Sequence, residues 1–180
     1  IYAANLLLDS HNLKKDFKAL NAQVEVFLRL YSEERDPEFY ALLIKLKQQA
    51  TFKRCSGLEG DKKRIEAARC FLKYANDFPD SEYADKSLYN AAFNYQKERL
   101  IEKSIQALLK LVNTASESDL VPKALFQIGK NLQDLAIFSK ASEAYEYYAK
   151  QFPKEKNAKE ALQNAADSGA DTPLPIPMIR

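Results

Sequence analysis

The side chains that could carry out catalysis are few in this sequence. His11 is the single histidine among 180 residues. A serine or cysteine nucleophile needs a base to activate it, and no second histidine is present to serve that role. We therefore interpret His11 as a surface or satisfied core residue. Asp and Glu are numerous, but on the solvent faces of helices carboxylates are usually just hydrated. We expect a protein that is not an enzyme.

The two cysteines, Cys55 and Cys70, do not form a metal-binding pattern. Zinc sites usually combine closely spaced cysteines with one another or with paired histidines, and the sequence has neither arrangement. We interpret both cysteines as small buried hydrophobic residues. A disulfide between them remains an alternative for a chain in an oxidising compartment. We expect no bound metal and no cofactor.

Glycine-rich and basic segments are equally sparse. The segment Gly57-x-x-Gly60 is too short for a phosphate-binding loop, and no Gly-Lys-Ser/Thr follows it. The basic triplet at 62–64 is balanced by neighbouring acidic residues, and 27 basic against 25 acidic side chains leave a net charge of +2. This balance does not favour nucleic-acid binding. No run of 18 apolar residues occurs, so we expect no insertion into a membrane.

Apolar residues recur with a helical period through most of the chain, and the low count of four glycines disfavours a turn-rich β fold. The first helix should bury a broad face made of Ala3, Ala4, Leu6, Leu7, Leu8 and Leu13. A turn is expected at 56–61, where two glycines lie close together. The expected helices cover residues 2–15, 16–31, 37–54, 62–76, 81–97, 101–113, a pair from 122 to 152, and 157–168.

Two similar segments end aromatic, alanine-rich helical stretches. Phe78-Pro79 and Phe152-Pro153 place their prolines 74 residues apart (153 − 79), twice a period of 37. A period of this size is typical of arrays of helical pairs. The junction between the two, at Val112–Ser116, has no proline, and we expect it to be looser.

Small residues recur where paired helices should cross. Ala92 and Ser104 in one unit correspond to Gly129 and Ala141 in the next, with large residues beside them. This pattern, with a proline at the end of the unit, resembles the tetratricopeptide repeat. The resemblance implies an all-α, right-handed solenoid of about four helical hairpins and a C-terminal cap helix over residues 1–168.

The same resemblance implies which side chains face the concave groove of the array, and these would bind an extended apolar peptide. Carried over by position, they are Asn5, Asp9, Asn12, Phe52, Tyr89, Phe93, Gln96, Lys97, Phe126, Lys130, Gln133 and Asp134. For Tyr89 and Phe126, simple packing against neighbouring helices is an equally good interpretation.

The segment 169–180 differs in kind from the rest, because prolines at 173, 175 and 177 exclude a helix and favour an extended chain. We expect this tail to dock in an apolar groove of its own chain or of a neighbour, which would produce a homo-oligomer. A crystal contact, or a return along the last helices, is the alternative. The apolar side chains that would dock are Leu174, Ile176, Met178 and Ile179.

These features predict a non-catalytic scaffold that binds a protein or peptide partner. A second hypothesis is a structural or assembly factor that binds through its convex face or its ends. A third is an accessory domain of a longer chain. The Phe-Pro-Asp-Ser segment and the residues after it are similar to tetratricopeptide proteins of the bacterial cell envelope, which favours the periplasm by resemblance only.

Overall fold

The computed structural model describes residues 1–168, and within this range every regular element is an α-helix. The expectation of an all-α chain is confirmed for these residues. The helices are α1 (Tyr2–Leu13), α2 (Phe17–Leu30), α3 (Pro37–Gly60), α4 (Arg64–Asp77), α5 (Ala84–Lys97), α6 (Ile101–Thr114), α7 (Val121–Asp134), α8 (Phe138–Gln151) and α9 (Ala158–Asp167). The tail residues Leu174, Ile176, Met178 and Ile179 lie outside the described range.

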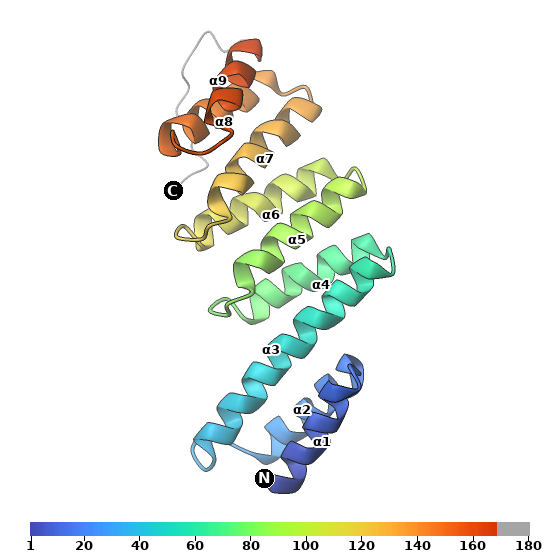
Figure 1. Ribbon diagram of the computed structural model, residues 1–180. Helices are drawn as coiled ribbons and strands as arrows, with labels where there is room; N and C mark the ends of the chain where they lie inside the picture. Colours follow the sequence, from blue (N-terminus) through green and yellow to red (C-terminus); the bar gives the residue numbers. More distant parts are fainter. Residues whose placement is uncertain (169–180) are drawn as a thin grey trace.

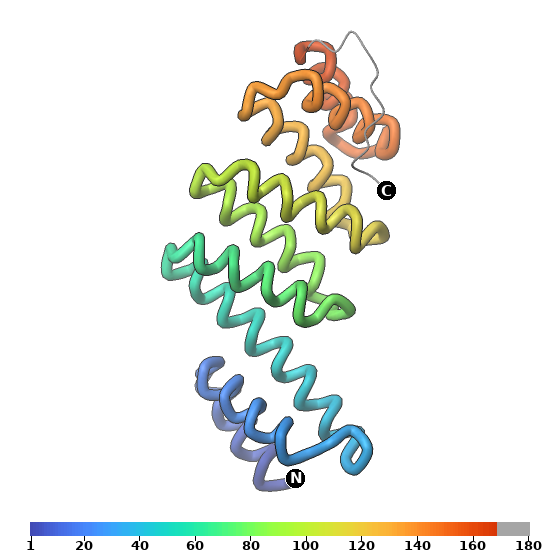
Figure 2. Tube along the Cα trace, turned by 180° about the vertical axis from the view of Figure 1, so that it is seen from behind, coloured from blue at the N-terminus to red at the C-terminus, as the bar shows by residue number. Residues whose placement is uncertain are grey.

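Each helix packs against the next helix along the chain, from α1·α2 through to α8·α9. The result is an elongated body with α1 and α2 at one end and α8 and α9 at the other (Figure 1). Seen from behind, the chain runs back and forth across this body as it advances from one end to the other (Figure 2). Helices that are far apart in the sequence are therefore far apart in space.

The turns inside the helical hairpins share one backbone feature. Lys15, Lys62, Arg99 and Ala136 each have a positive φ, between 54° and 62°. Residues with this conformation reverse the chain sharply at the end of a helix. The last three are spaced by 37 residues, whereas Lys62 follows Lys15 by 47 (62 − 15). The longer first interval reflects the length of α3, which has 24 residues where α5 has 14.

The connections between successive hairpins also repeat. After α4, the backbone N–H of Ser81 donates to the carbonyl of Phe78, and the N–H of Ala84 donates to Ser81. The same two hydrogen bonds recur 37 residues later, at Ser118 and Val121, and 37 residues later again. The proline-free junction after α6 is therefore built like the others, and the expectation of a looser junction is wrong. Backbone hydrogen bonds, rather than proline, set this connection.

Helix α3 continues through the segment that the sequence predicted to be a turn. It extends to Gly60, and the chain reverses only at Lys62. Cys55 is fully buried and Leu58 packs against the main core, so continuing the helix keeps both side chains in place. The prediction failed because burial of these apolar residues outweighs the low helix propensity of Gly57, about 1 kcal/mol relative to alanine.

Two hydrophobic cores share α3. Its first half joins the smaller core with α1 and α2, through Phe39, Leu43 and Ala50. Its second half joins the larger core, which continues from Cys55 to Ala165. The extra length of α3 therefore connects the N-terminal hairpin to the more regular hairpins that follow.

Helix α1 buries much less than the sequence predicted. Only Ala4 and Leu8 are buried, whereas Leu6, Leu7 and Leu13 are 54%, 41% and 85% exposed. The apolar residues of α1 surround the helix, but α1 lies at the end of the body and packs mainly against α2. One helical face can be covered by such a neighbour, and the opposite face stays open.

Candidate functional site

Two clefts each contain two or more of the predicted groove residues, and the larger lies between the N-terminal hairpin and the start of α5. It has a volume of ≈ 490 Å³ and includes the predicted residues Asn12 and Phe52. Its other walls are aromatic, polar and basic side chains: Lys15, Phe17, Gln49, Lys53 and Tyr83. No acidic side chain lines it, so the cleft combines aromatic surface with two ammonium groups.

Phe52 is held in this cleft by a cluster of rings. It stacks on Tyr83 with ring centroids 4.9 Å apart and meets the edges of Phe71 and Tyr74 at 5.5 and 5.8 Å. Phe71 and Tyr74 are fully buried, so they fix the orientation of Phe52 from below. A ring held in place loses little conformational freedom when a ligand covers it, which favours binding.

The smaller cleft lies along α5 and has a volume of ≈ 170 Å³. It brings together three predicted groove residues, Tyr89, Phe93 and Gln96, beside Gln127 of α7. Phe93 is 42% exposed although it is a large apolar side chain, and the ammonium group of Lys97 lies 5.1 Å from its ring centroid. An exposed ring in a cleft is a natural contact for an apolar ligand side chain.

A buried hydrogen-bond chain holds the far wall of this cleft. The amide nitrogen of Gln127 donates to the side-chain oxygen of Asn131 at 3.0 Å, and Asn131 donates to the hydroxyl of Ser104 at 3.0 Å. Asn131 and Ser104 are buried, so these bonds form away from bulk water. The chain links α7 to α6 and fixes the position of Gln127 at the cleft.

Phe126 is not part of an open surface. It is only 8% exposed, and its ring packs 5.6 Å from Tyr145 and 5.4 Å from Tyr148. The structure therefore places Phe126 in the core, as the packing interpretation expected. Tyr89 occupies the matching position 37 residues earlier, where α6 presents the smaller Leu108 and Leu111, and it stays partly exposed at its cleft.

The remaining predicted residues do not join the two clefts. Asn5 lines a separate cleft at the N-terminal end, next to Ile1 and Pro37. Asp9, Lys130 and Asp134 are exposed. Gln133 accepts a hydrogen bond from the hydroxyl of Tyr145 at 3.1 Å, so it serves to hold that ring.

Several cleft residues were not predicted from the sequence. Tyr83 precedes α5, and Phe17 begins α2, so neither falls at a groove position of the repeat pattern. Gln127 is one position past the predicted Phe126. The signal that could have found it is its spacing of four residues from Asn131, which suits a hydrogen bond along a helix.

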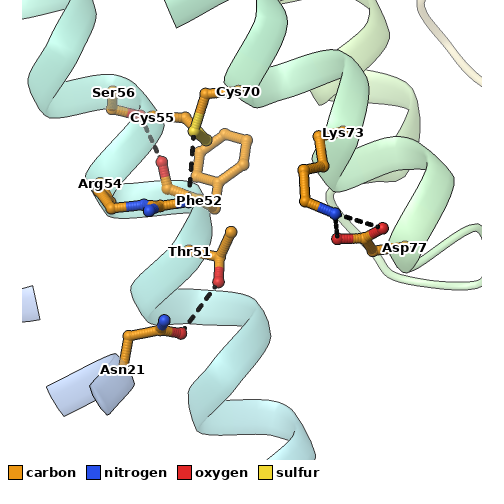
Figure 3. Close-up of a disulfide and its surroundings, with 9 residues drawn as sticks. All are labelled: Asn21, Thr51, Phe52, Arg54, Cys55, Ser56, Cys70, Lys73 and Asp77. Atoms are coloured by element: carbon orange, nitrogen blue, oxygen red, sulfur yellow. Dashed lines mark hydrogen bonds and ion pairs between the residues drawn. A yellow bond between two sulfur atoms is a disulfide. The ribbon is translucent and has the colours of Figure 1, made fainter. Parts of the chain in front are cut away.

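A disulfide between Cys55 and Cys70 joins α3 to α4 next to the larger cleft (Figure 3). Cys55 is fully buried, as expected, but the interpretation of both cysteines as unpaired hydrophobic residues is wrong. The two Cα atoms are 5.4 Å apart because facing residues of packed helices come this close. Nearby, the hydroxyl of Thr51 donates to the side-chain oxygen of Asn21 at 3.2 Å, which links α3 to α2 (Figure 3).

Tyr145, a fully buried residue of α8, should make the protein sensitive to alkaline pH. Burial raises the pKa of its phenol to about 12 from the ordinary value of 10.0. The unfolded chain therefore loses this proton at a lower pH than the folded chain does. The contribution of the neutral Tyr145 phenol to the free energy of unfolding is fully present below pH 10. It is lost progressively as the pH rises through 12, by up to about 1.4 kcal/mol per pH unit.

Urea unfolding followed by circular dichroism between roughly pH 9 and 11.5 would measure this effect. Tyr145→Phe has no proton to lose, so its free energy of unfolding should fall less steeply over the same interval. If the free energy of unfolding fell equally steeply with pH in the parent chain and in Tyr145→Phe, the alkaline sensitivity would not come from Tyr145.

Two further features were sought in the part of the chain that the structure describes. Residues 1–168 contain no group of three or more His, Cys, Asp or Glu side chains arranged to hold a metal ion. Among the same residues, no helix has the length and apolar character required to cross a membrane. Comparison with models of known protein families finds no match, and comparison with curated proteins finds no significant match.

Proposed function

We propose that this protein is a non-catalytic scaffold, built as a tetratricopeptide-like solenoid, that binds an extended apolar peptide along the clefts of α3, α5 and α7. The observation that carries the proposal is the exposed ring of Phe93 inside a cleft that Tyr89 and Gln96 also line. Most large apolar side chains of the regular hairpins are buried, and an exposed ring that lies inside a cleft beside polar groups favours a binding role.

The repeat character of the chain supports the solenoid part of the proposal. The reversing residues at 62, 99 and 136 recur every 37 residues, and each helix packs against its sequence neighbours. Both features are typical of arrays in which one supersecondary unit stacks on the next.

The larger cleft adds a charge preference to the proposed ligand. Lys15 and Lys53 supply ammonium groups beside the rings of Phe17 and Phe52. A peptide that carries apolar side chains and a carboxylate would satisfy both features. The chain's own segment 169–180 has this composition, with Asp171 preceding Leu174, Ile176 and Met178, so it is a suitable first ligand.

Replacing Phe93 with alanine should weaken binding of a synthetic peptide of residues 169–180. The experiment is isothermal titration of this peptide into a chain that lacks residues 170–180, so that no attached tail competes. We expect the dissociation constant to rise at least about tenfold, since truncating a phenylalanine that a ligand covers costs on the order of 1.5–3 kcal/mol.

Phe138→Ala is the matched control, because Phe138 is 50% exposed but lies outside both clefts. It should bind the peptide as the parent chain does. Equal losses for the two variants would contradict a specific role for Phe93, and absence of binding up to millimolar peptide would contradict the tail as ligand.

A second candidate function is a structural or assembly factor of a bacterial envelope complex that binds through its convex face or its ends. The disulfide supports such a location, because disulfides persist in oxidising compartments such as the periplasm and are rare in the cytosol. Unchanged binding of a protein partner by the Phe93→Ala variant, with unchanged helicity, would favour this candidate.

A further inference from the structure

The two sulfur atoms of the Cys55–Cys70 disulfide lie in different surroundings. Cys55, on α3, is 0% exposed and belongs to the larger hydrophobic core, whereas Cys70, on α4, is only partly buried. The Nη2 atom of Arg54 donates to the Sγ atom of Cys70 at 3.9 Å, and the Arg54 side chain is exposed (Figure 3). One sulfur therefore faces the apolar core, and the other faces a cation at the surface.

This difference should persist when the bond is reduced, because other contacts hold α3 against α4. Phe52 of α3 and Phe71 of α4 pack with ring centroids 5.5 Å apart, close in the chain to the two cysteines. The thiolate is the reactive form of cysteine, and a neighbouring cation favours it, whereas apolar surroundings disfavour it. In the reduced chain, Cys70 should therefore be the accessible and more ionised sulfur, while Cys55 stays a protonated thiol.

Two further charged side chains lie about one turn from Cys70 on α4. Glu66 precedes it by four residues, and Lys73 follows it by three. Their charges are opposite, and Lys73 is paired with Asp77 at 2.8 Å. The contact with Arg54 therefore gives the surroundings of Cys70 their positive character.

We propose that Cys70 is the site at which a disulfide-bearing oxidant reacts with the reduced protein, that Arg54 stabilises its thiolate, and that Cys55 completes the bond. The site takes disulfides as a chemical class, because the reaction requires access to only one sulfur of the protein. Arg54 acts through Cys70 and is therefore a positioning residue. The inference concerns the chemistry of the disulfide, so it does not depend on the proposed peptide binding.

Two successive exchanges account for the electrons and protons. Cys70 loses its proton to solvent and attacks one sulfur of the oxidant, which forms a mixed disulfide on Cys70 and releases a thiolate that takes up a proton. Cys55 then loses its proton and attacks the Sγ atom of Cys70, which forms the protein disulfide and releases the second thiolate. Two protein thiols are oxidised, and one external disulfide is reduced to two thiols. Reduction by an external thiol follows the same steps in reverse, since Cys70 carries the sulfur that it can reach.

Two full-length variants with a single cysteine each test which sulfur reacts first. Cys55→Ala retains Cys70, and Cys70→Ala retains Cys55. Each variant is mixed with bis(2-hydroxyethyl) disulfide, an uncharged reagent, at neutral pH, and mass spectrometry follows the mixed disulfide. Cys55→Ala should react at least about 100-fold faster, because Cys55 becomes accessible only when the helices open locally. In concentrated urea the two variants should react at similar rates, and circular dichroism checks the fold without urea.

Arg54→Met, added to Cys55→Ala, should slow the reaction of Cys70 about two- to threefold at low salt. One exposed charge changes the thiolate fraction modestly, and the thiolate of a less acidic thiol is a better nucleophile, which offsets part of the loss. Arg54→Lys keeps the charge and should restore most of the rate. Salt at roughly 1 M should remove the difference between Arg54 and Met, because it screens exposed charges. A purely structural role of Arg54 would not depend on salt in this way.

Arg69→Met is the matched control. It removes the same charge from the exposed residue directly before Cys70, which points about 100° away around the helix, and it should leave the rate nearly unchanged. Equal rates for the two single-cysteine variants without urea, whether or not they are folded, overturn the proposal, and so does faster reaction of Cys70→Ala. A rate that Arg54→Met leaves unchanged, or that Arg54→Lys does not restore, overturns the role of Arg54.

Discussion

Removing the Cys55–Cys70 disulfide should lower the free energy of unfolding by about 3 kcal/mol. The bond closes a short loop, with a sequence separation of 15, and so restricts the conformations that the unfolded chain can adopt. It also connects α3 to α4 where the larger hydrophobic core begins, with Cys55 fully buried. The effect should therefore reach the cooperative unit that contains α4 and the helices after it.

The measurement is urea unfolding of the parent chain with and without a thiol reductant, and of Cys55→Ala/Cys70→Ala. The reductant should lower the urea concentration at which half of the parent chain is unfolded. It should not change this concentration for the double variant, which has no bond to reduce. The double variant should resemble the reduced parent. A parent chain whose midpoint does not respond to complete reduction, checked by thiol counting, would contradict the expected role of the bond.

Replacing Gly129 with alanine should destabilise the protein by about 1–3 kcal/mol, although alanine is the better helix former. Gly129 lies in the middle of α7, where α8 crosses closely. An added Cβ would lie 2.7 and 2.8 Å from two ring carbons of Tyr145, well inside van der Waals contact. The repeat pattern predicted a helix crossing at this small residue. The ring of Tyr145 is the neighbour that requires the residue to be small.

The ring of Tyr145 has little freedom to move away. It is fully buried, packs against Phe126 and donates a hydrogen bond to Gln133. Accommodating the methyl group would displace α7 from α8 or push the ring out of its position. Either change disturbs packing in the larger core, which explains why the clash should outweigh the gain in helix propensity.

The same substitution at Gly57 gives a matched control with the opposite sign. Gly57 lies inside α3, and an added Cβ would have no atom within 4 Å. Gly57→Ala should therefore stabilise the protein by up to about 1 kcal/mol. A second test combines Gly129→Ala with Tyr145→Leu, which removes the ring, and the two losses should then be less than additive. Stabilisation by Gly129→Ala alone would refute the close crossing.

Local patterns predicted the helices well. Apart from the end of α3, apolar spacing located the helices within a few residues, because one buried stripe recurs every three to four positions whatever the helix packs against. The separation of 74 residues between Pro79 and Pro153, twice a period of 37, also predicted the 37-residue spacing of the reversing residues Arg99 and Ala136. The positions of small residues predicted where α7 and α8 approach each other.

The candidate site was predicted only in part. Tyr89, Phe93 and Gln96 do line one cleft, because they share the face of a single regular helix. Phe126 has the matching position in the next hairpin, yet it is buried, because Tyr145 and Tyr148 of α8 are large enough to cover it. Tyr83 and Phe17 reach the larger cleft from the ends of helices, where a repeat pattern has no position for them.

By itself, the sequence determined where this chain is helical and how often its hairpins repeat, since both depend on interactions between residues close in the chain. Only the tertiary structure decided that α3 continues through Gly57, that Cys55 and Cys70 are joined, and that Leu6 and Leu13 face outward. Each of these depends on which side chains a neighbouring helix brings within reach, or fails to bring. Contacts of this kind form between residues distant in the chain, so no local pattern can specify them.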